Sequence, residues 1–443
     1  MIPILLLAAV LTAPPQDTAR LTVAAAIDRA LASHPAVAAA RASVYVAAAD
    51  VGQARASWLP SLSLDGSVSK FQKPMIVWPL HGLDLRNPPF FDTEVSQAAL
   101  GASYTLFDFG ARSSRVKAAE SQRDAADAGL GATEQQLVAR TLAAYLRVLT
   151  TRGILTAEDQ RVTALAAESK RARERLAAGK AARLDTLRAA AEFANAAADR
   201  VASAANVEVA EHDLARLMGV HYATVHSAAL TGVGLTRLAG DSPADQSAAV
   251  ARAGGTNADI QVAERRADAA AASVGAAKAS RMPQFQASSA IVDRSNITGR
   301  WLSEWQVGLG MSWPLFTGGA RESAISRAEA SSRAAREQLR LTRMAAEQQL
   351  DDARALFDAS RARLAALAAT AEQAAEVARI TALSRDVGDG TQTDYLLAEA
   401  SLFRARSGLV QARHAVIAAR VELARVLGEL NRAWITTALE SQP

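Results

Sequence analysis

Cysteine is absent from the 443 residues, which excludes disulfide bonds, cysteine-based metal sites and a lipid anchor on an N-terminal cysteine. Aromatic residues make up only 5% of the chain, although half of its residues are hydrophobic. Alanine and the aliphatic residues therefore supply the apolar content. A composition rich in Ala, Glu, Arg, Gln and Leu is typical of long helices and coiled coils, and not of ordinary globular domains.

Long hydrophobic runs are also lacking, since no stretch of 18 consecutive apolar residues occurs. The short apolar run Ile4–Leu11 has the length of a signal-peptide core, and we expect residues 1–19 to be a signal peptide. The net charge of +4 is spread along the chain without a basic cluster interleaved with aromatics, so we expect no nucleic-acid partner.

Sequence signatures of catalysis are missing as well. The chain contains no nucleophile elbow, no phosphate-binding loop, and no His, Asp or Glu cluster with metal-ligand spacing. We therefore expect a protein that is not an enzyme and that holds no cofactor.

One junction organises the sequence that is present. Between Trp305 and Trp313 apolar residues alternate with small or polar ones, which indicates a strand with one apolar face. Pro314 then ends the ladder, Gly318 and Gly319 turn the chain, and an Ala/Glu/Arg-rich segment with helical period follows. The sequence thus predicts a strand that leads directly into a very long helix.

The same junction occurs earlier in the chain at a constant offset. Residues that match 209 positions apart include Phe107 and Phe316, Gly110 and Gly319, Arg112 and Arg321, Gly179 and Gly388, and Asp185 and Asp394. A constant offset over such a length indicates an internal duplication.

The duplication gives the predicted organisation, which is mainly helical with a β portion. After the signal peptide we expect a first repeat over 20–219, a linker over 220–255, a second repeat over 256–430 and a C-terminal tail over 431–443. Within the repeats we expect strand pairs at 61–107 and 284–313, long helices at 111–178 and 320–387, and return helices at 184–218 and 393–427. Each long helix would span about 100 Å and is expected in a coiled-coil bundle.

Four amphipathic strands are too few to close a barrel, and an open apolar sheet would leave its edges unpaired in lipid. We therefore expect other subunits to complete the sheet. Three chains would supply twelve strands, enough to surround a pore, with the apolar faces toward lipid and the Ser, Gln and Gly faces toward the lumen.

Taken together, the duplicated strand pair, the Pro314–Gly319 junction, the long helix and the Gly-x5-Asp turn resemble the TolC-like outer membrane efflux protein family, the outer membrane factors. The resemblance covers Leu21 to Leu430. It implies a homotrimer with a 12-stranded transmembrane barrel in the outer membrane of a Gram-negative bacterium, continuing into an α-barrel tunnel across the periplasm. It also implies a passive exit duct for a tripartite efflux pump or a type I secretion system. The lack of cysteine matches the non-lipidated members.

The resemblance assigns roles to the turns between the long and return helices. It implies that Asp394 forms a periplasmic gate, with Asp185 as its repeat partner; a second gate Asp of the family is replaced by Leu397, which leaves Asp389 as a candidate. Helix capping is an alternative and compatible role for Asp185 and Asp394. We also expect ion pairs of Arg183 and Arg385 with Asp394 or Asp386.

Partners follow from the same resemblance. A periplasmic adaptor would dock on the tip around Gly179, Lys180, Val387 and Gly388, and an inner-membrane transporter, either proton-driven or ABC, would complete the pump. At the other end, Pro314, Phe316, Gly319, Phe107 and Gly110 would form the barrel-to-helix junction. The cargo stays open among drugs, metal ions and proteins. The alternative interpretation is a periplasmic coiled-coil adaptor or scaffold.

Overall fold

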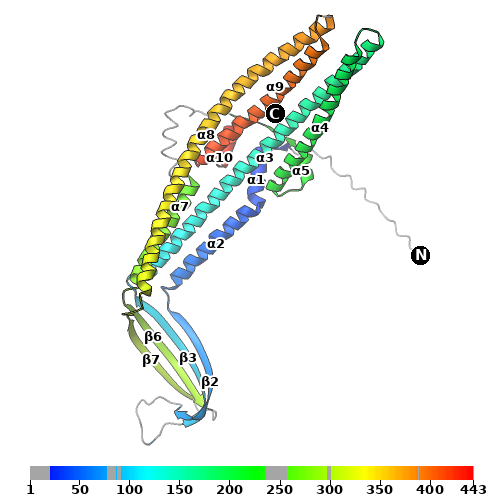
Figure 1. The fold of residues 1–443 in the computed structure, drawn as a ribbon. Coiled ribbons are helices and arrows are strands. Elements are labelled where there is room, and N and C mark those ends of the chain that lie inside the picture. The colour runs from blue at the N-terminus through cyan, green and yellow to red at the C-terminus, as the bar shows by residue number, and fades with distance from the viewer. Residues whose placement is uncertain are drawn as a thin grey trace, which may run out of the picture. The chain divides into compact units, whose positions relative to one another are not determined.

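The computed structural model describes residues 20–76, 86, 91–235, 257–296, 301–387 and 389–442. The expected signal peptide at 1–19 and Gly388 lie outside the described residues. The helices, labelled in Figure 1, are α1 (Val23–Ser33), α2 (Pro35–Ala56), α3 (Ala111–Ala177), α4 (Arg183–Met218), α5 (Tyr222–His226), α7 (Ala258–Ala279), α8 (Ala320–Val387), α9 (Gln392–Val426) and α10 (Arg432–Ala438). The strands are β1 (Arg20–Leu21), β2 (Ser61–Ile76), β3 (Phe91–Phe107), β4 (Ala229–Leu230), β5 (Gly232–Leu235), β6 (Gln284–Asn296), β7 (Trp301–Ser312) and β8 (Leu439–Gln442).

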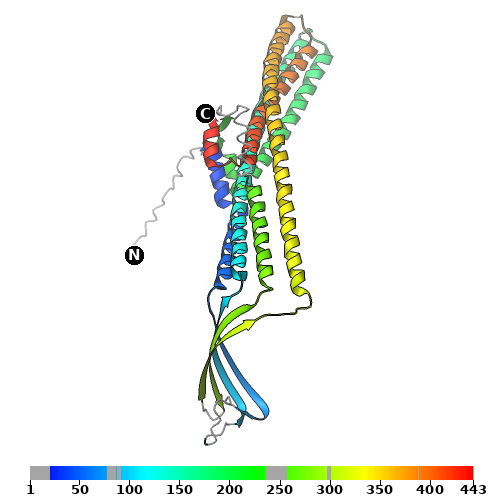
Figure 2. The same ribbon diagram turned by 90° about the vertical axis from the view of Figure 1, so that its left-hand side faces the viewer.

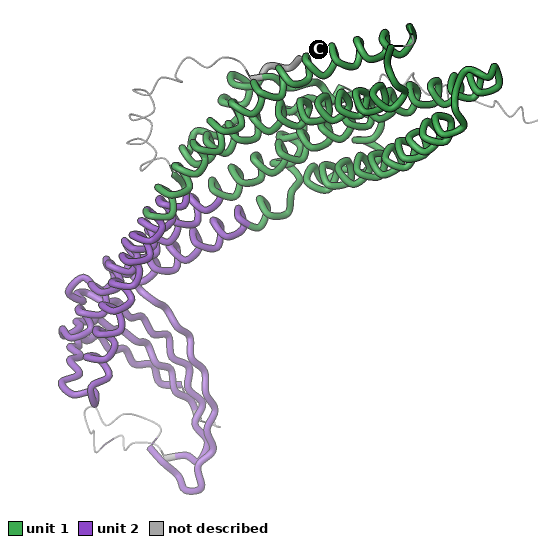
Figure 3. Tube along the Cα trace, turned by 45° about the horizontal axis from the view of Figure 1, so that its top comes forward, with its two compact units in different colours: residues 1–39, 131–258, 344–443 green, residues 40–130, 259–343 purple. Residues whose placement is uncertain are grey.

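The chain divides into two compact units, coloured separately in Figure 3. Unit 1 comprises residues 1–39, 131–258 and 344–443, and unit 2 comprises 40–130 and 259–343. Each unit takes segments from both sequence repeats. The predicted fold class, mainly helical with four long strands, is confirmed.

Unit 2 contains one four-stranded antiparallel sheet in the order β2-β3-β6-β7 (Figures 1 and 2). The central pairing joins β3 of the first repeat to β6 of the second, with Leu100 opposite Ile291. The strands β2 and β7 are therefore the outer strands, and each has a partner on one side only within the described residues.

The sheet has one apolar and one polar face because side chains alternate along each strand. Opposite one another on the apolar face lie Leu64 and Leu100, and Ile291 and Trp305. These side chains are exposed in the single chain, and Leu309 on the same face reaches 81% exposure. The opposite face carries small and polar residues, among them Ser61, Ser63, Ser67, Gln97, Ser288 and Gln306.

The two strand-to-helix junctions need left-handed backbone, which explains their glycines. Gly110 has a φ of 85° and Gly319 a φ of 81°, as the matching positions of the duplication require. Phe107 and Phe316 lie exposed beside them, and Pro314 ends β7 in an exposed position.

Chemically, the two junctions differ. In the first, buried Asp108 accepts hydrogen bonds from the backbone N of Arg112 at 2.8 Å and from its Nε at 3.1 Å. The same guanidinium lies 4.3 Å from the ring centre of Trp58. In the second junction Thr317 stands where Asp108 stands in the first, and Nη2 of Arg321 has no hydrogen-bond partner in the part of the chain that the structure describes.

Unit 1 contains α3 from residue 131 onward, α8 from residue 344 onward, and the whole of α4 and α9. It also contains a group of short elements, α1, α5, α10 and the short strands β1, β4, β5 and β8, which we call the belt. Tyr145 of α3 anchors the belt from its fully buried position. Its hydroxyl lies 2.7 Å from the carbonyl oxygen of Leu21 and 2.8 Å from that of Thr231. Burial raises the pKa of Tyr145 to about 12, so this hydroxyl stays neutral and keeps its proton for donation.

The belt also includes two segments for which the sequence predicted no helices or strands. The predicted linker at 220–255 contains α5, β4 and β5, and the predicted C-terminal tail at 431–443 contains α10 and β8. In this predicted tail, β8 pairs antiparallel with β5 and α10 packs on α1. Among the described helices, none combines the length and the hydropathy that a membrane span requires.

The buried ion pair at the first junction yields a stability prediction. Replacing Asp108 with Ala leaves the guanidinium of Arg112 buried without its carboxylate, and we expect a loss of about 3–5 kcal/mol in unfolding free energy. Thermal unfolding of the purified protein measures this loss. Thr317→Ala at the matching position of the second junction is the control, and equal effects of the two substitutions would contradict a stabilising role for the ion pair.

Candidate functional site

The two turns between the long and return helices lie at the same end of unit 1 (Figures 1 and 2). After α3, Gly179 adopts a φ of 69° and lets the N of Lys180 donate to the carbonyl of Arg175 at 2.8 Å. This is the usual way in which a left-handed residue ends a helix. After α8, Gly390 packs so closely that a Cβ there would lie 3.0 Å from the N of Arg385.

The return helices begin in different ways, and neither predicted gate Asp is the cap. Helix α9 is capped by Thr391, whose Oγ1 accepts from the N of Asp394 at 3.1 Å and donates to Oδ2 of Asp394 at 2.6 Å. Helix α4 begins after Ala182 without a side-chain cap. The capping alternative for Asp185 and Asp394 was therefore wrong, because each Asp lies inside the first turn of its helix.

These acidic side chains remain accessible. Asp394 and Asp389 are exposed, Asp185 is half-buried, and Arg183 is exposed at the start of α4. A carboxylate in the first turn of a helix is stabilised by the helix dipole without being neutralised by it. These carboxylates are therefore open to an ion or partner that approaches the tip, next to the exposed cations Lys180 and Arg183.

Arg385 is buried and has a partner that the sequence did not predict. Its side chain is only 5% exposed, and its Nη1 donates to Oε2 of Glu168 on α3, also 5% exposed, at 2.7 Å. The same guanidinium donates to Oδ1 of Asp386 at 2.8 and 3.1 Å and lies 4.0 Å from the ring centre of Tyr395. The expected pair with Asp386 is present, whereas the carboxylate of Asp394 bonds to Thr391 instead.

This arrangement fixes the charge states of the group. Burial alone lowers the pKa of Arg385, but the hydrogen bond to Asp386 and the charge of Glu168 outweigh burial and raise that pKa. The bond to Arg385 lowers the pKa of Asp386. Arg385 therefore stays charged and ties α3 of the first repeat to α8 and α9 of the second. A second tie is the bond from Nη1 of Arg188 on α4 to Oγ1 of Thr393 at 2.8 Å.

No sequence motif marks Glu168, which lies eleven residues before Gly179 within a long, charged helix. Its matching position in the second repeat is Val377, and this replacement of Glu by Val is the one trace that a comparison of the repeats could have detected. The predicted docking residues lie as expected on the surface: Gly179, Lys180 and Val387 are exposed, and Gly388 lies outside the described residues.

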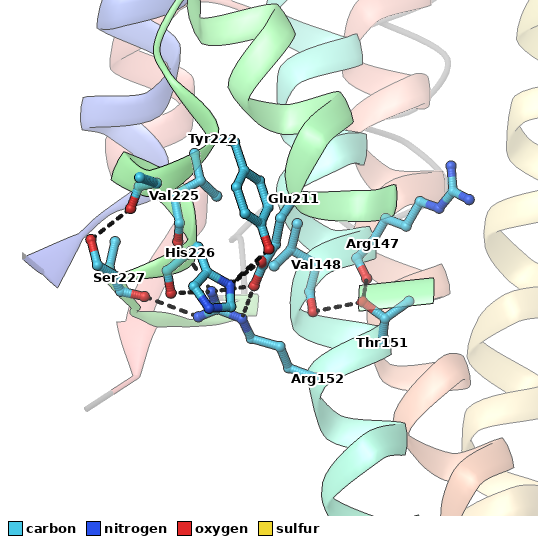
Figure 4. Close-up of polar contacts among 11 residues, drawn as sticks. Arg147, Val148, Thr151, Arg152, Glu211, Tyr222, Val225, His226 and Ser227 are labelled. Carbon is cyan, nitrogen blue, oxygen red and sulfur yellow. Dashed lines mark hydrogen bonds and ion pairs between the residues drawn. The ribbon is translucent and has the colours of Figure 1, made fainter. Parts of the chain in front are cut away.

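A second polar cluster, also missed by the sequence, holds the belt to the long helices (Figure 4). Glu211 of α4 is 1% exposed. Its carboxylate accepts hydrogen bonds from Nη2 of Arg152 at 2.6 Å and from Nδ1 of His226 at 2.8 Å. Arg152 also donates to the carbonyls of Val225 and Ala228 at 3.1 and 3.0 Å. Burial raises the pKa of Glu211, but the bonds from His226 and Arg152 outweigh burial and lower it.

The buried tie at the tip predicts unequal effects of two carboxylate substitutions. Glu168→Gln removes a buried charge from Arg385 and should cost about 2 kcal/mol in local stability. Asp386→Asn removes a carboxylate that is 59% exposed and should cost little. Hydrogen exchange of the α8–α9 turn reports the difference. Faster exchange in the Asp386 variant than in the Glu168 variant would show that the buried bond does not hold the tip.

The belt cluster predicts a pH dependence. Because the folded-state pKa of Glu211 is lowered, its stabilisation is present above the ordinary carboxyl pKa of about 4.3 and is lost as the pH falls through the folded value. Glu211→Gln should lower the melting temperature at pH 6, and the gap from the parent should narrow below about pH 4. Melting curves from pH 6 to 3 test this, and a gap independent of pH would refute it.

Comparison with known proteins places this geometry in a family. The family described as "Outer membrane efflux protein" matches residues 26–220 and 250–429 of the chain. The outer membrane efflux protein BepC of Brucella suis is 25% identical over 413 residues, which cover 92% of this chain and 86% of BepC. The outer membrane protein TolC of Vibrio cholerae is 25% identical over 354 residues, which cover 77% of this chain and 78% of TolC.

Solved structures share the fold. The outer membrane protein VceC of Vibrio cholerae matches with a TM-score of 0.78 and 24% identity, over 92% of this chain and 96% of VceC. The CmeC outer membrane channel of Campylobacter jejuni matches with a TM-score of 0.79 and 15% identity, over 93% of this chain and 86% of CmeC.

These matches decide between the channel and the adaptor that the sequence left as alternatives. The family match spans both repeats and leaves out most of the segment between them. The chain belongs to the outer membrane efflux protein family, whose TolC-like members are non-enzymatic channels of the outer membrane that extend into the periplasm.

Proposed function

We propose that three copies of this protein form the exit duct of an export machine, which conducts its cargo passively from the periplasmic side to the exterior. The four-stranded sheet carries this proposal. Its apolar face is exposed and its outer strands β2 and β7 each lack one neighbour within the described residues. In lipid every backbone N–H and C=O needs a partner, so such a sheet is stable only when it is closed into a barrel.

Three copies supply this closure. If β7 of one copy pairs with β2 of the next, about twelve strands form a ring wide enough for an aqueous lumen. The serine- and glutamine-rich face then lines the lumen and offers hydrogen bonds to water, whereas Leu64, Leu309 and Trp305 meet lipid. The same face carries the charged residues Asp65, Arg294 and Glu304, and Arg294 pairs with Glu304 at 2.9 Å.

The tip supplies the gate in this proposal. Asp394 and Asp185, repeated in three copies, form rings of negative charge that attract cations and narrow the pore, and exposed Asp389 adds a further ring. Arg385 acts indirectly, because its bond to Glu168 keeps the α8–α9 turn in place. Exposed Arg183 next to Asp185 moderates the negative charge of the first turn.

Two partners complete the machine. A periplasmic adaptor docks on the exposed tip residues Gly179, Lys180 and Val387, and on the adjacent Gly388. The exposed Val387 side chain gives the adaptor an apolar contact, and Lys180 gives it a charge. An inner-membrane transporter, proton-driven or ABC, delivers the cargo and selects it.

Channel recording in planar bilayers tests both the duct and its gate. We expect the purified oligomer to give small, cation-preferring channels. Asp394→Ala should raise the conductance roughly twofold or more and weaken the cation preference, because it removes one ring of charge from the constriction.

The control is Asp213→Ala, which removes the same charge near the other end of α4 and should leave both quantities unchanged. Channels that respond equally to both substitutions would move the gate away from the tip. A folded oligomer that forms no channels would contradict the proposed function as an exit duct.

A further inference from the structure

The two strand-to-helix junctions share one framework, at the end of the sheet where the long helices begin (Figures 1 and 2). Arg55 pairs with Glu120 on α3 at 2.6 Å, and Lys278 pairs with Glu329 on α8 at 2.9 Å. Glu120 and Glu329 are 209 residues apart, and each cation stands five residues before the proline that precedes a strand. The junctions can therefore be compared position by position.

The first junction is closed and neutral. Oδ2 of Asp108 accepts hydrogen bonds from both the backbone N and Nε of Arg112, and the two side chains are only 7% and 4% exposed. The ring of Trp58 covers this guanidinium at 4.3 Å. Phe109 fills the space next to it and packs edge-on against Phe107, with 4.6 Å between the ring centres.

At the second junction the carboxylate, the packed ring and the covering ring are all replaced. The replacements are Thr317 for Asp108, Gly318 for Phe109 and Arg281 for Trp58. A negative charge is thus lost, a positive charge is gained, and the space of an aromatic ring is opened. Apart from its chain neighbours, no atom would lie within 4 Å of a Cβ at Gly318.

These replacements leave Arg321, the counterpart of Arg112, with unused donors. Its Nη2 is shielded from solvent and has no hydrogen-bond partner among the described residues. Its backbone N, in the first turn of α8, has no acceptor among them either. Shielded donors without a partner cost free energy, above all on a charged group. The junction therefore fits an anion at the place that the carboxylate of Asp108 takes in the first junction.

A second guanidinium adds to the positive charge. Nη2 of Arg281 lies 3.8 Å from Oε1 of Glu322, and both side chains are more than half exposed. An exposed pair at this distance is weak. Two guanidinium groups and one carboxylate therefore leave an excess of one positive charge beside the turn. Guanidinium groups bind the oxygens of a phosphate in a bidentate manner, so phosphate is the anion that this arrangement suits.

The apolar surroundings favour a phosphate that belongs to a lipid. Trp313, Leu315 and Phe316 are 51%, 80% and 88% exposed and follow directly on the apolar face of β7. The indole N of Trp313 donates to the carbonyl of Arg281 at 3.0 Å, which holds this ring beside the cations. Aromatic side chains of this kind mark the boundary between lipid tails and headgroups in membrane barrels.

We propose that the second junction binds the phosphate group of a phospholipid in the inner leaflet of the outer membrane. Arg321 and Arg281 donate to the phosphate oxygens, and Leu315 and Phe316 contact the acyl chains. The proposal rests on the proposed function, which places the sheet in that membrane with its long helices on the periplasmic side. Each copy has one such site, because Asp108 already occupies Arg112 at the first junction.

Native mass spectrometry of the detergent-purified protein tests the site, because it counts bound lipids and measures the oligomer in the same spectrum. The probe is phosphatidylglycerol, and the control ligand is diacylglycerol with the same acyl chains, which lacks the phosphate. We expect up to three tightly bound phosphatidylglycerol molecules per trimer and no comparable binding of diacylglycerol.

Three variants locate the binding. Arg321→Gln should weaken phosphatidylglycerol binding about tenfold, because it removes a charged donor from the phosphate. Thr317→Asp should weaken it as much without lowering the melting temperature, because it gives Arg321 the carboxylate that Arg112 has. The control Arg336→Gln removes an exposed charge about 22 Å further along α8 and should leave binding unchanged.

Four outcomes would contradict the proposal. A trimer in which Arg321→Gln and Thr317→Asp bind phosphatidylglycerol like the parent would overturn the lipid site and leave the duct standing. Displacement of the lipid by millimolar inorganic phosphate would show a site for free anions and overturn the lipid as its ligand. An Arg321→Gln trimer that dissociates more easily but binds lipid normally would assign this guanidinium to the next copy. A monomeric parent would overturn the proposed function, and the site with it.

Discussion

The unpaired backbone along the outer strands of the sheet is the constraint on which the rest of the molecule depends. In β2 and β7 the outward N–H and C=O groups have no partner among the described residues, while the adjacent side chains are too apolar to face water. Neither water nor lipid satisfies such a sheet, so its stability requires copies of itself.

Because of the internal duplication, two similar repeats of one chain pack against each other. Each repeat supplies a strand pair, a long helix and a return helix, and the contact between β3 and β6 joins the two repeats within a chain. The two repeats differ in their buried polar residues. Asp108 has Thr317 as its counterpart, and Glu168 has Val377. The two buried ion pairs, Asp108–Arg112 and Glu168–Arg385, therefore have no ionic counterpart at the matching positions of the duplication.

The tip combines a buried part and an accessible part. Arg385 is held by Glu168, Asp386 and the ring of Tyr395, and this fixes the α8–α9 turn against α3. The carboxylates of Asp389 and Asp394 stay in contact with solvent a few residues away. Charge that acts on ions or partners must remain hydrated, whereas charge that positions a turn is most effective when buried with its partner.

By itself the sequence determined the duplication, the strand-to-helix junctions, the helix lengths and the position of the two turns, because periodicity, Pro314 and paired glycines such as Gly110 and Gly319 are local signals. The resemblance to the family also singled out Asp394 as a candidate gate residue, and this role stays a proposal. Only the tertiary structure decided that Thr391 caps α9 and that Arg385 bonds to Glu168, which lies 217 residues away. It likewise brought the C-terminal strand β8 into the belt. Pairings of this kind depend on which helix faces and strand edges meet in space, and no local pattern records them.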